Sequence, residues 1–177
     1  TTQAFYLVVD SQIDGVVLDE MNDWIGAFKD GVCVGSWPWV GEYTTIPVMG
    51  DDGYDETDGY MNNDDIPEFL IFDGSAGVAY PAVASGDYPW ANFAFYTLDN
   101  INVYPDCNND LGGDAFTDDC GVCSEGLSGH EANSDQDCSG ECFGDAIYDE
   151  CGVCGGNNFA DECIGTDNCW PFMDCAG

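Results

Sequence analysis

The stretch FKDGVCVG, residues 28–35, contains the clearest turn signal of the chain, the pair Asp30-Gly31. Apolar residues flank this pair on both sides. Asp-Gly favours the two-residue turn of a β-hairpin, because both central residues of that turn adopt positive φ angles that Asp and Gly tolerate. The stretch therefore predicts two antiparallel strands joined by a tight turn.

Other apolar runs of strand length occur on both sides of this hairpin. They are AFYLVV (4–9), WIGAF (24–28), VCVGSW (32–37), TTIPVM (44–49), EFLIF (68–72) and ANFAFYTL (91–98). Glycine and aspartate turn signals separate the runs, and none of them has the period of a helix. Short strands at this spacing are typical of an antiparallel β-sandwich, so we expect an all-β domain over residues 1–105.

Residues 106–177 have a different composition, rich in Gly, Asp, Asn and Cys and poor in apolar runs. Residues 106–123 (DCNNDLGGDAFTDDCGVC) and 137–154 (DCSGECFGDAIYDECGVC) align without gaps at an offset of 31 residues. Burial alone cannot offset the entropy of ordering such a chain. We therefore expect a loop-dominated repeat region that is held together by covalent or metal crosslinks.

Ten of the eleven cysteines lie in this repeat region. The spacing of Cys120, Cys123, Cys151 and Cys154 is also that of a zinc site, and Cys-Gly-Val-Cys also suits redox catalysis. The other cysteines and the acidic surroundings favour structural disulfides over both alternatives. The cysteines expected in disulfides are Cys107, Cys120, Cys123, Cys138, Cys142, Cys151, Cys154, Cys163, Cys169 and Cys175. Cys33 is expected to be an unpaired, buried thiol, with an intermolecular disulfide as the alternative.

The charge balance is extreme, because 35 Asp and Glu residues stand against one Lys and no Arg, for a formal net charge of −34. Nucleic acid is not expected as a partner, since phosphate binding depends on clustered Lys and Arg. No run reaches the ~18 apolar residues of a membrane span. The many cysteines favour an oxidising compartment, so we expect a mature, secreted or cell-surface protein with an extracellular location.

Calcium is the expected counter-ion for this acidity. DQDCSGE, residues 135–141, places side-chain oxygens on alternate residues before a glycine, as the first half of a calcium loop does. The other repeat copy and the acidic segment 50–65 offer similar oxygens. The candidate ligands are Asp106, Asn108, Asp110, Asp114, Asp135, Asp137, Ser139, Glu141, Asp145, Asp51 and Asp52. A solvated acidic loop without a metal is the alternative.

Catalysis has little support in the sequence. His130 is the only histidine and lies in a glycine-rich loop, where a surface role is expected. No pair of carboxylates stands out among 35, so we expect a protein that is not an enzyme. Trp37 and Trp39 alternate around Pro38, which suits either a stacking platform for sugar rings or packing in the core.

Four stretches, DWIGAFKDGVCVGSWPW (23–39), IPVMGDDG (46–53), DGYMNNDDIPEFLIFD (58–73) and AYPA (79–82), resemble a β-sandwich module of secreted, multi-modular surface proteins from environmental bacteria. DECGVCGG (149–156) resembles the cysteine-rich repeats that accompany such modules and, more distantly, thrombospondin type 3 calcium repeats. The resemblance implies an extracellular, calcium-associated, non-catalytic building block. Leu111 stands where the second copy has Cys142, so a uniform disulfide pattern is not implied.

Together these observations favour a structural subunit of an extracellular fibre, filament or surface appendage that self-assembles and is stabilised by disulfides and calcium. A carbohydrate-binding or cell-adhesion module is the alternative. AFYLVV (4–9) is apolar on both faces, which suits a strand inserted into the sheet of a neighbouring subunit. Phe5, Leu7 and Val9 would then fill pockets of that subunit. An inner strand of the chain's own sandwich is the alternative for this run.

Overall fold

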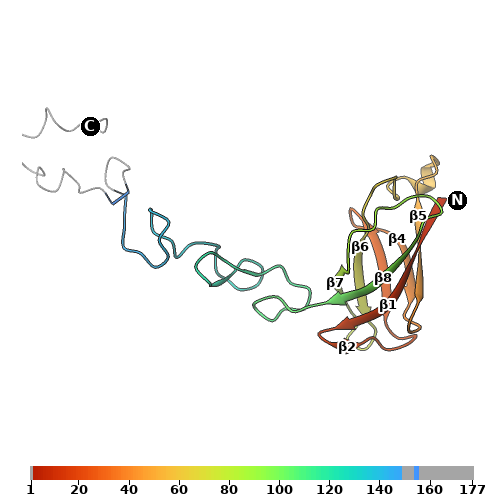
Figure 1. The fold of residues 1–177 in the computed structure, drawn as a ribbon, viewed down its shortest axis with the longest axis horizontal. Coiled ribbons are helices and arrows are strands. Elements are labelled where there is room, and N and C mark those ends of the chain that lie inside the picture. Colours follow the sequence, from red (N-terminus) through yellow and green to blue (C-terminus); the bar gives the residue numbers. More distant parts are fainter. Residues whose placement is uncertain (1, 149–153, 156–177) are drawn as a thin grey trace, which may run out of the picture. The chain divides into compact units, whose positions relative to one another are not determined.

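A computed structural model of the chain describes residues 2–148, 154 and 155. The chain divides into two compact units, Thr1–Asp114 and Ala115–Gly177. We call the first unit the β domain and the second the tail. Figure 1 shows the strands of the β domain and the loops of the tail.

The division lies after Asp114, whereas the sequence places the boundary after residue 105. Two contacts explain the difference. Leu111 packs against the core of the β domain, and the Gly112 N–H donates to the Tyr104 carbonyl at 2.9 Å. The start of the first repeat copy therefore belongs to the β domain.

The strands of the β domain are β1 (Thr2–Ile13), β2 (Val16–Val17), β3 (Trp24–Lys29), β4 (Val32–Pro38), β5 (Thr44–Gly50), β6 (Glu68–Asp73), β7 (Val78–Ala84) and β8 (Phe95–Val103), with a short 3-10 helix η1 (Asp55–Thr57). They form one sheet of order β2-β1-β8-β7-β6-β3-β4, and β5 pairs with β1. In the tail, β9 (Phe116–Thr117) pairs with β10 (Cys123–Ser124). The prediction of an all-β fold is confirmed.

The hairpin predicted from residues 28–35 joins β3 to β4. Lys29 pairs with Val32 across the turn. Asp30 has a φ of 48° and Gly31 a φ of 79°, as a two-residue hairpin turn requires. The local prediction from Asp30-Gly31 is therefore confirmed.

Strand β1 is an inner strand of this sheet. It pairs antiparallel with β5, from Thr2 opposite Gly50 to Val8 opposite Thr44. It also pairs in parallel with β8, from Phe5 opposite Phe95 to Ile13 opposite Val103, which the expectation of a wholly antiparallel sheet did not include. Figure 1 shows β1 beside β8.

This pairing changes the interpretation of the N-terminal strand. Over residues 5–8 both edges of β1 are hydrogen-bonded within the chain, so this segment has no free edge to offer to another subunit. Tyr6 and Val8 are fully buried in the chain's own core. Phe5, Leu7 and Val9 lie on the other face and are half-buried. The structure therefore gives β1 an intramolecular role in place of the expected insertion into a neighbour.

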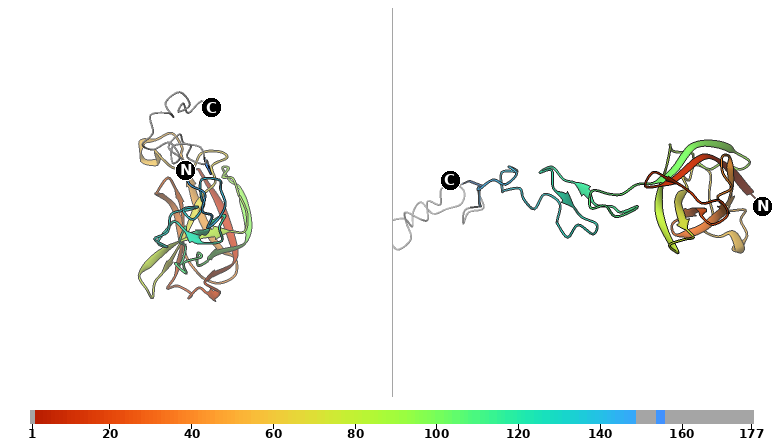
Figure 2. Two further views of the ribbon diagram at one scale, coloured as in Figure 1. Left: turned by 90° about the vertical axis from the view of Figure 1, so that its left-hand side faces the viewer. Right: turned by 90° about the horizontal axis from the view of Figure 1, so that it is seen from below.

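The sheet curls until β4 approaches β5, which Figure 2 shows from two further directions. A Cβ added to Gly35 on β4 would lie 2.0 Å from the Pro47 carbonyl oxygen on β5. Pro47 has no N–H and cannot donate to β4. A glycine on β4 and a proline on β5 thus bring the two backbones together without a ladder of hydrogen bonds.

The core of the β domain lies inside this curl. Its most buried large side chains include Tyr6, Ile25, Ile46, Met61, Ile71, Leu98 and Ile101. Trp90 is also buried, and its indole N–H donates to the Val48 carbonyl at 3.0 Å. Trp39 is only 2% exposed, so it packs in the core and is not available as part of a sugar-stacking platform with Trp37.

Candidate functional site: the aspartate loops

Three short loops in the described chain share one hydrogen-bond pattern centred on an aspartate. We call them Asp loop 1 (residues 106–110), Asp loop 2 (118–122) and Asp loop 3 (137–141). In each loop, Oδ1 of the aspartate accepts from the backbone N–H groups two and four residues further along, a pattern typical of Asp in turns. The donors are Asn108 (2.8 Å) and Asp110 (2.9 Å), Cys120 (2.9 Å) and Val122 (3.0 Å), and Ser139 (2.8 Å) and Glu141 (3.0 Å).

The sequence specifies these loops through residues that tolerate unusual backbone angles. The fourth residue of each loop is Asn109, Gly121 or Gly140, with φ of 66°, 76° and 85°. Asn and Gly adopt this left-handed conformation more readily than other residues. Gly144 is needed for a different reason, since a Cβ there would lie 2.1 Å from Asp137 Oδ2.

Disulfides join the Asp loops to one another. Cys142, which directly follows Asp loop 3, bonds to Cys120 of Asp loop 2. Cys154 bonds back to Cys138 of Asp loop 3. Cys107 and Cys123 are disulfide-bonded as well. The prediction of structural disulfides is confirmed for these six cysteines. Because Cys120, Cys123 and Cys154 are disulfide-bonded, they cannot bind zinc as thiolates.

The remaining cysteines have separate outcomes. Cys151, Cys163, Cys169 and Cys175 lie outside the described residues. Cys33 is unpaired as expected, but it is exposed and not buried. It lies opposite Phe28 at the end of the β3–β4 hairpin.

The departure of Leu111 from the repeat now has a structural explanation. Leu111 and Cys142 both stand five residues after the aspartate of their loop, and each forms a bridge with the residue before that aspartate, Pro105 or Gln136. Cys142 anchors Asp loop 3 to the preceding loop through a disulfide. Leu111 instead anchors Asp loop 1 by packing against the core of the β domain.

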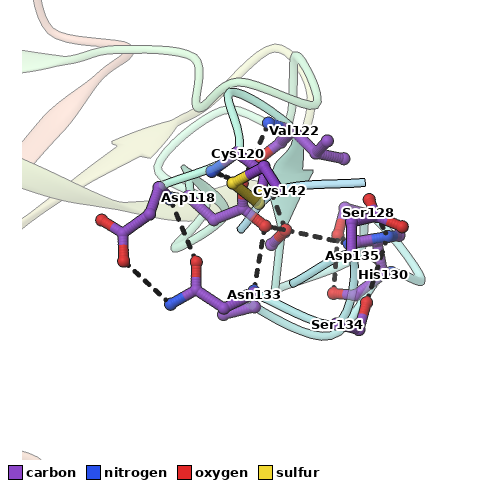
Figure 3. Close-up of polar contacts among 12 residues, drawn as sticks. Asp118, Cys120, Val122, Ser128, His130, Asn133, Ser134, Asp135 and Cys142 are labelled. Carbon is purple, nitrogen blue, oxygen red and sulfur yellow. Dashed lines mark hydrogen bonds and ion pairs between the residues drawn. A yellow bond between two sulfur atoms is a disulfide. The ribbon is translucent and has the colours of Figure 1, made fainter. Parts of the chain in front are cut away.

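The carboxylate of Asp118 accepts four hydrogen bonds. Beyond the two loop N–H groups, its Oδ2 accepts from the Ser124 hydroxyl at 2.8 Å and the Asn133 N–H at 3.0 Å. Figure 3 shows these contacts around the labelled Asp118. Burial alone would raise the pKa of Asp118, yet the hydrogen bonds from Asn133, Val122, Ser124 and Cys120 outweigh it and lower the pKa to about 2. The carboxylate therefore holds several segments of the tail together.

His130 lies next to this carboxylate and is less isolated than the sequence indicates. Its Nδ1 is 3.0 Å from the Ser124 hydroxyl oxygen, and its Nε2 is 3.2 Å from Asp135 Oδ2 and 3.2 Å from the Ser134 hydroxyl oxygen (Figure 3). A serine, a histidine and an aspartate in this order resemble the arrangement of a hydrolase. Ser124, however, is fully buried and donates its hydroxyl hydrogen to Asp118, so it cannot attack a substrate.

The predicted calcium ligands are already engaged in hydrogen bonds or are exposed. Asp106 and Asp137 accept backbone N–H groups, Asn108 donates to Asp110 at 2.8 Å, and Ser139 donates to Asp137 at 2.7 Å. Asp51 and Asp52 accept from Gly53 and Thr57, and Asp135 pairs with His130. Asp114, Glu141 and Asp145 are exposed. Among the described residues, no three His, Cys, Asp or Glu side chains are grouped to hold a metal ion. Calcium binding stays a prediction.

Comparison of the chain with models of known families, with curated proteins and with solved structures found no match. The resemblance to a bacterial surface module therefore stays a prediction as well. In the part of the chain that the structure describes, no helix is long and apolar enough to cross a membrane.

The Asp loops should lose stability in acid. The pKa of Asp137 is lowered from 3.8 to about 2, chiefly by the hydrogen bond from the Ser139 hydroxyl. The pKa of Asp118 is also lowered from 3.8 to about 2. A carboxylate whose pKa is lower in the folded state stabilises the fold above its unfolded pKa and loses this contribution as it is protonated. We expect the stability of the tail to fall as pH drops from 3.8 towards about 2.

Urea denaturation over this pH range, together with a carboxyl titration by NMR, measures the effect. Asp118→Asn should flatten the acid dependence, because the amide cannot be protonated in this range. Glu131→Gln is the control on an exposed carboxylate of the tail and should leave the dependence intact. Titration of Asp118 at its ordinary pKa would contradict the prediction.

Proposed function

We propose that the chain is a non-enzymatic structural subunit of an extracellular fibre or surface appendage. The observation that carries this proposal is the covalent connection of successive Asp loops. Cys120–Cys142 links Asp loops 2 and 3, and Cys138–Cys154 links Asp loop 3 to the chain that follows. Repeats that are each joined to their neighbour suit a load-bearing or spacing element.

The chemistry of the tail supports this function. A region poor in apolar residues cannot rely on a core, and crosslinks stabilise it chiefly by restricting its unfolded state. Such disulfides persist in oxidising environments outside the cytosol. The carboxylates of Asp118 and Asp137 accept hydrogen bonds from several backbone N–H groups, so part of the acidity contributes to the fold.

Self-association belongs to the proposal, but through a surface other than β1. This strand is hydrogen-bonded on both edges over residues 5–8 and contributes Tyr6 and Val8 to the core. Withdrawing it to pair with another subunit would break the core of its own domain. The assembly contact that we propose therefore leaves β1 in place.

Calcium also belongs to the proposal, as counter-charge for a chain of formal net charge −34. Its ligands would come from carboxylates that do not hold backbone N–H groups, such as Asp110, Asp114 and Asp145. An ion that binds only the folded state stabilises it by mass action. We expect excess EGTA to lower the melting temperature of the purified chain, and added calcium to restore it. An unchanged melting temperature and proteolysis pattern in EGTA would contradict calcium binding.

Electron microscopy of native material tests the fibre proposal. We expect ordered filaments that contain this chain, identified by mass spectrometry of the same preparation. Reduction of the disulfides should weaken or disperse these filaments, while the same buffer without reductant serves as the control. Monodisperse particles at all concentrations would overturn the proposal.

A further inference from the structure

Strands β3 and β6 carry large apolar residues on both faces, and Glu68 is a charged residue at the start of β6 on the outward face. Their inward residues include Ile25, Ala27 and Ile71, all fully buried. Their outward residues include Trp24 and Phe72, which are 41% and 40% exposed. A sheet with one face on the core and the other in water ordinarily alternates apolar and polar residues. An outward row of large apolar side chains on paired strands therefore indicates a binding surface.

The outward face contains a shallow groove of about 410 Å³. Trp24 lies opposite Phe72, and Gly26 lies opposite both Ser36 and Leu70. The ring of Phe28 lies over Gly26, since any Cβ there would lie 2.7 Å from this ring. A groove of this volume, with aromatic walls and one hydroxyl from Ser36, matches the size and lining of sites for small ligands.

The charge of the groove narrows the choice of ligand. Its lining residues carry no charge and include Trp24, Phe28, Cys33, Ser36, Leu70 and Phe72. The whole chain, in contrast, carries a formal net charge of −34. Anionic polymers and nucleic acid would approach against this charge. The nearest carboxylate on this face belongs to Glu68, which lies opposite Phe28 and is not among the lining residues. The ligand that fits is uncharged.

We infer that this groove binds a neutral polysaccharide. Sugar rings present apolar C–H faces that can lie flat on exposed aromatic rings such as Trp24 and Phe72, while a hydroxyl such as that of Ser36 can bond to sugar hydroxyls. This inference does not depend on the fibre proposal. In this inference Trp24 and Phe72 form the stacking surface. Trp37 and Trp39 cannot form it together, because Trp39 is buried.

Trp37 provides a matched control for the experiment. It is 46% exposed, comparable to Trp24. It lies opposite Ile25, whereas Trp24 lies opposite Pro38. Neighbouring residues of a strand point to opposite faces, so Trp37 does not share the outward face with the groove. Loss of the Trp37 ring should therefore leave the groove unchanged.

The test measures retention of the full chain on microcrystalline cellulose, chitin and starch, with alginate as the acidic polysaccharide. We expect binding to at least one neutral polymer and none to alginate. Trp24→Ala and Ser36→Glu should each weaken that binding by about tenfold or more, equivalent to about 1.4 kcal/mol. Trp37→Ala should bind as the unmodified chain does. Ser36 is exposed, so the Ser36→Glu variant should fold. It therefore tests binding in the groove even if Trp24→Ala fails to fold.

Three results would overturn the inference. The first is no retention on any of the three neutral polymers. The second is an equal loss of retention for Trp37→Ala and Trp24→Ala, which would show that binding does not depend on the groove. The third is concentration-dependent association in sedimentation velocity that Ser36→Glu abolishes, because this face would then be an interface between copies of the chain.

Discussion

Replacing Gly35 with alanine is expected to lower the free energy of unfolding of the β domain by about 3 kcal/mol. The added methyl carbon would lie 2.0 Å from the Pro47 carbonyl oxygen and 3.0 Å from its carbonyl carbon. These are backbone atoms of a strand that is itself paired with β1, so they cannot move aside by a change of rotamer. The approach of β4 to β5 would have to open. Urea denaturation followed by tryptophan fluorescence measures the loss.

Gly86→Ala is the matched control for this change. A Cβ at Gly86 would meet the Tyr88 side chain at 3.6 Å, an ordinary contact. We expect a change in stability within about 0.5 kcal/mol, as for most surface substitutions. If the Gly35→Ala variant were as stable as the Gly86→Ala variant, β4 and β5 would not approach each other closely at Gly35.

Removing the disulfide between Cys120 and Cys142 is expected to destabilise the tail by about 3 kcal/mol. The bond closes a segment with a sequence separation of 22 residues, and opening it enlarges the unfolded ensemble. The double variant Cys120→Ser with Cys142→Ser should therefore be digested faster by chymotrypsin. Phe143 is 67% exposed and offers a cleavage site next to the broken link. Trypsin is unsuitable, because the chain has a single Lys or Arg residue.

Cys33→Ser is the control for the loss of a sulfur atom, because Cys33 is unpaired and exposed. It should leave the digestion rate of the tail unchanged. An equal rate of cleavage for the double variant and the unmodified chain would show that Cys120–Cys142 does not stabilise the tail. Peptide mapping without reductant should recover the Cys120–Cys142 and Cys138–Cys154 crosslinks.

The sequence singled out the aspartates of Asp loops 1 and 3 but not Asp118 of Asp loop 2. Asp106 and Asp137 were identified by their spacing as calcium ligands. In the structure their carboxylates accept N–H groups of their own loops, from Asn108 and Ser139 among others. Alternating oxygens before a glycine suit both a metal loop and an Asp-centred turn, so spacing alone does not distinguish them. The offset of 31 residues relates Asp loops 1 and 3 but does not include Asp loop 2.

The aromatic groove was missed for a related reason. WIGAF and EFLIF are apolar at almost every position, which predicts strands but not which face of each strand is covered. The exposed pair of Trp24 and Phe72 is evident only once β3 and β6 are placed side by side. Trp37 and Trp39 drew attention instead, because alternation around Pro38 is visible in the sequence.

By itself, the sequence determined the all-β class, the Asp30-Gly31 hairpin and the disulfide-rich repeat region. These features depend on turn chemistry and cysteine spacing within short segments, where few residues set the backbone angles. The tertiary structure alone decided that β1 is an inner strand, that Leu111 anchors the first Asp loop, and that Trp39 is buried while Trp24 is exposed. These outcomes depend on which distant segments pair, and for an apolar strand the sequence does not specify the partner or the covered face.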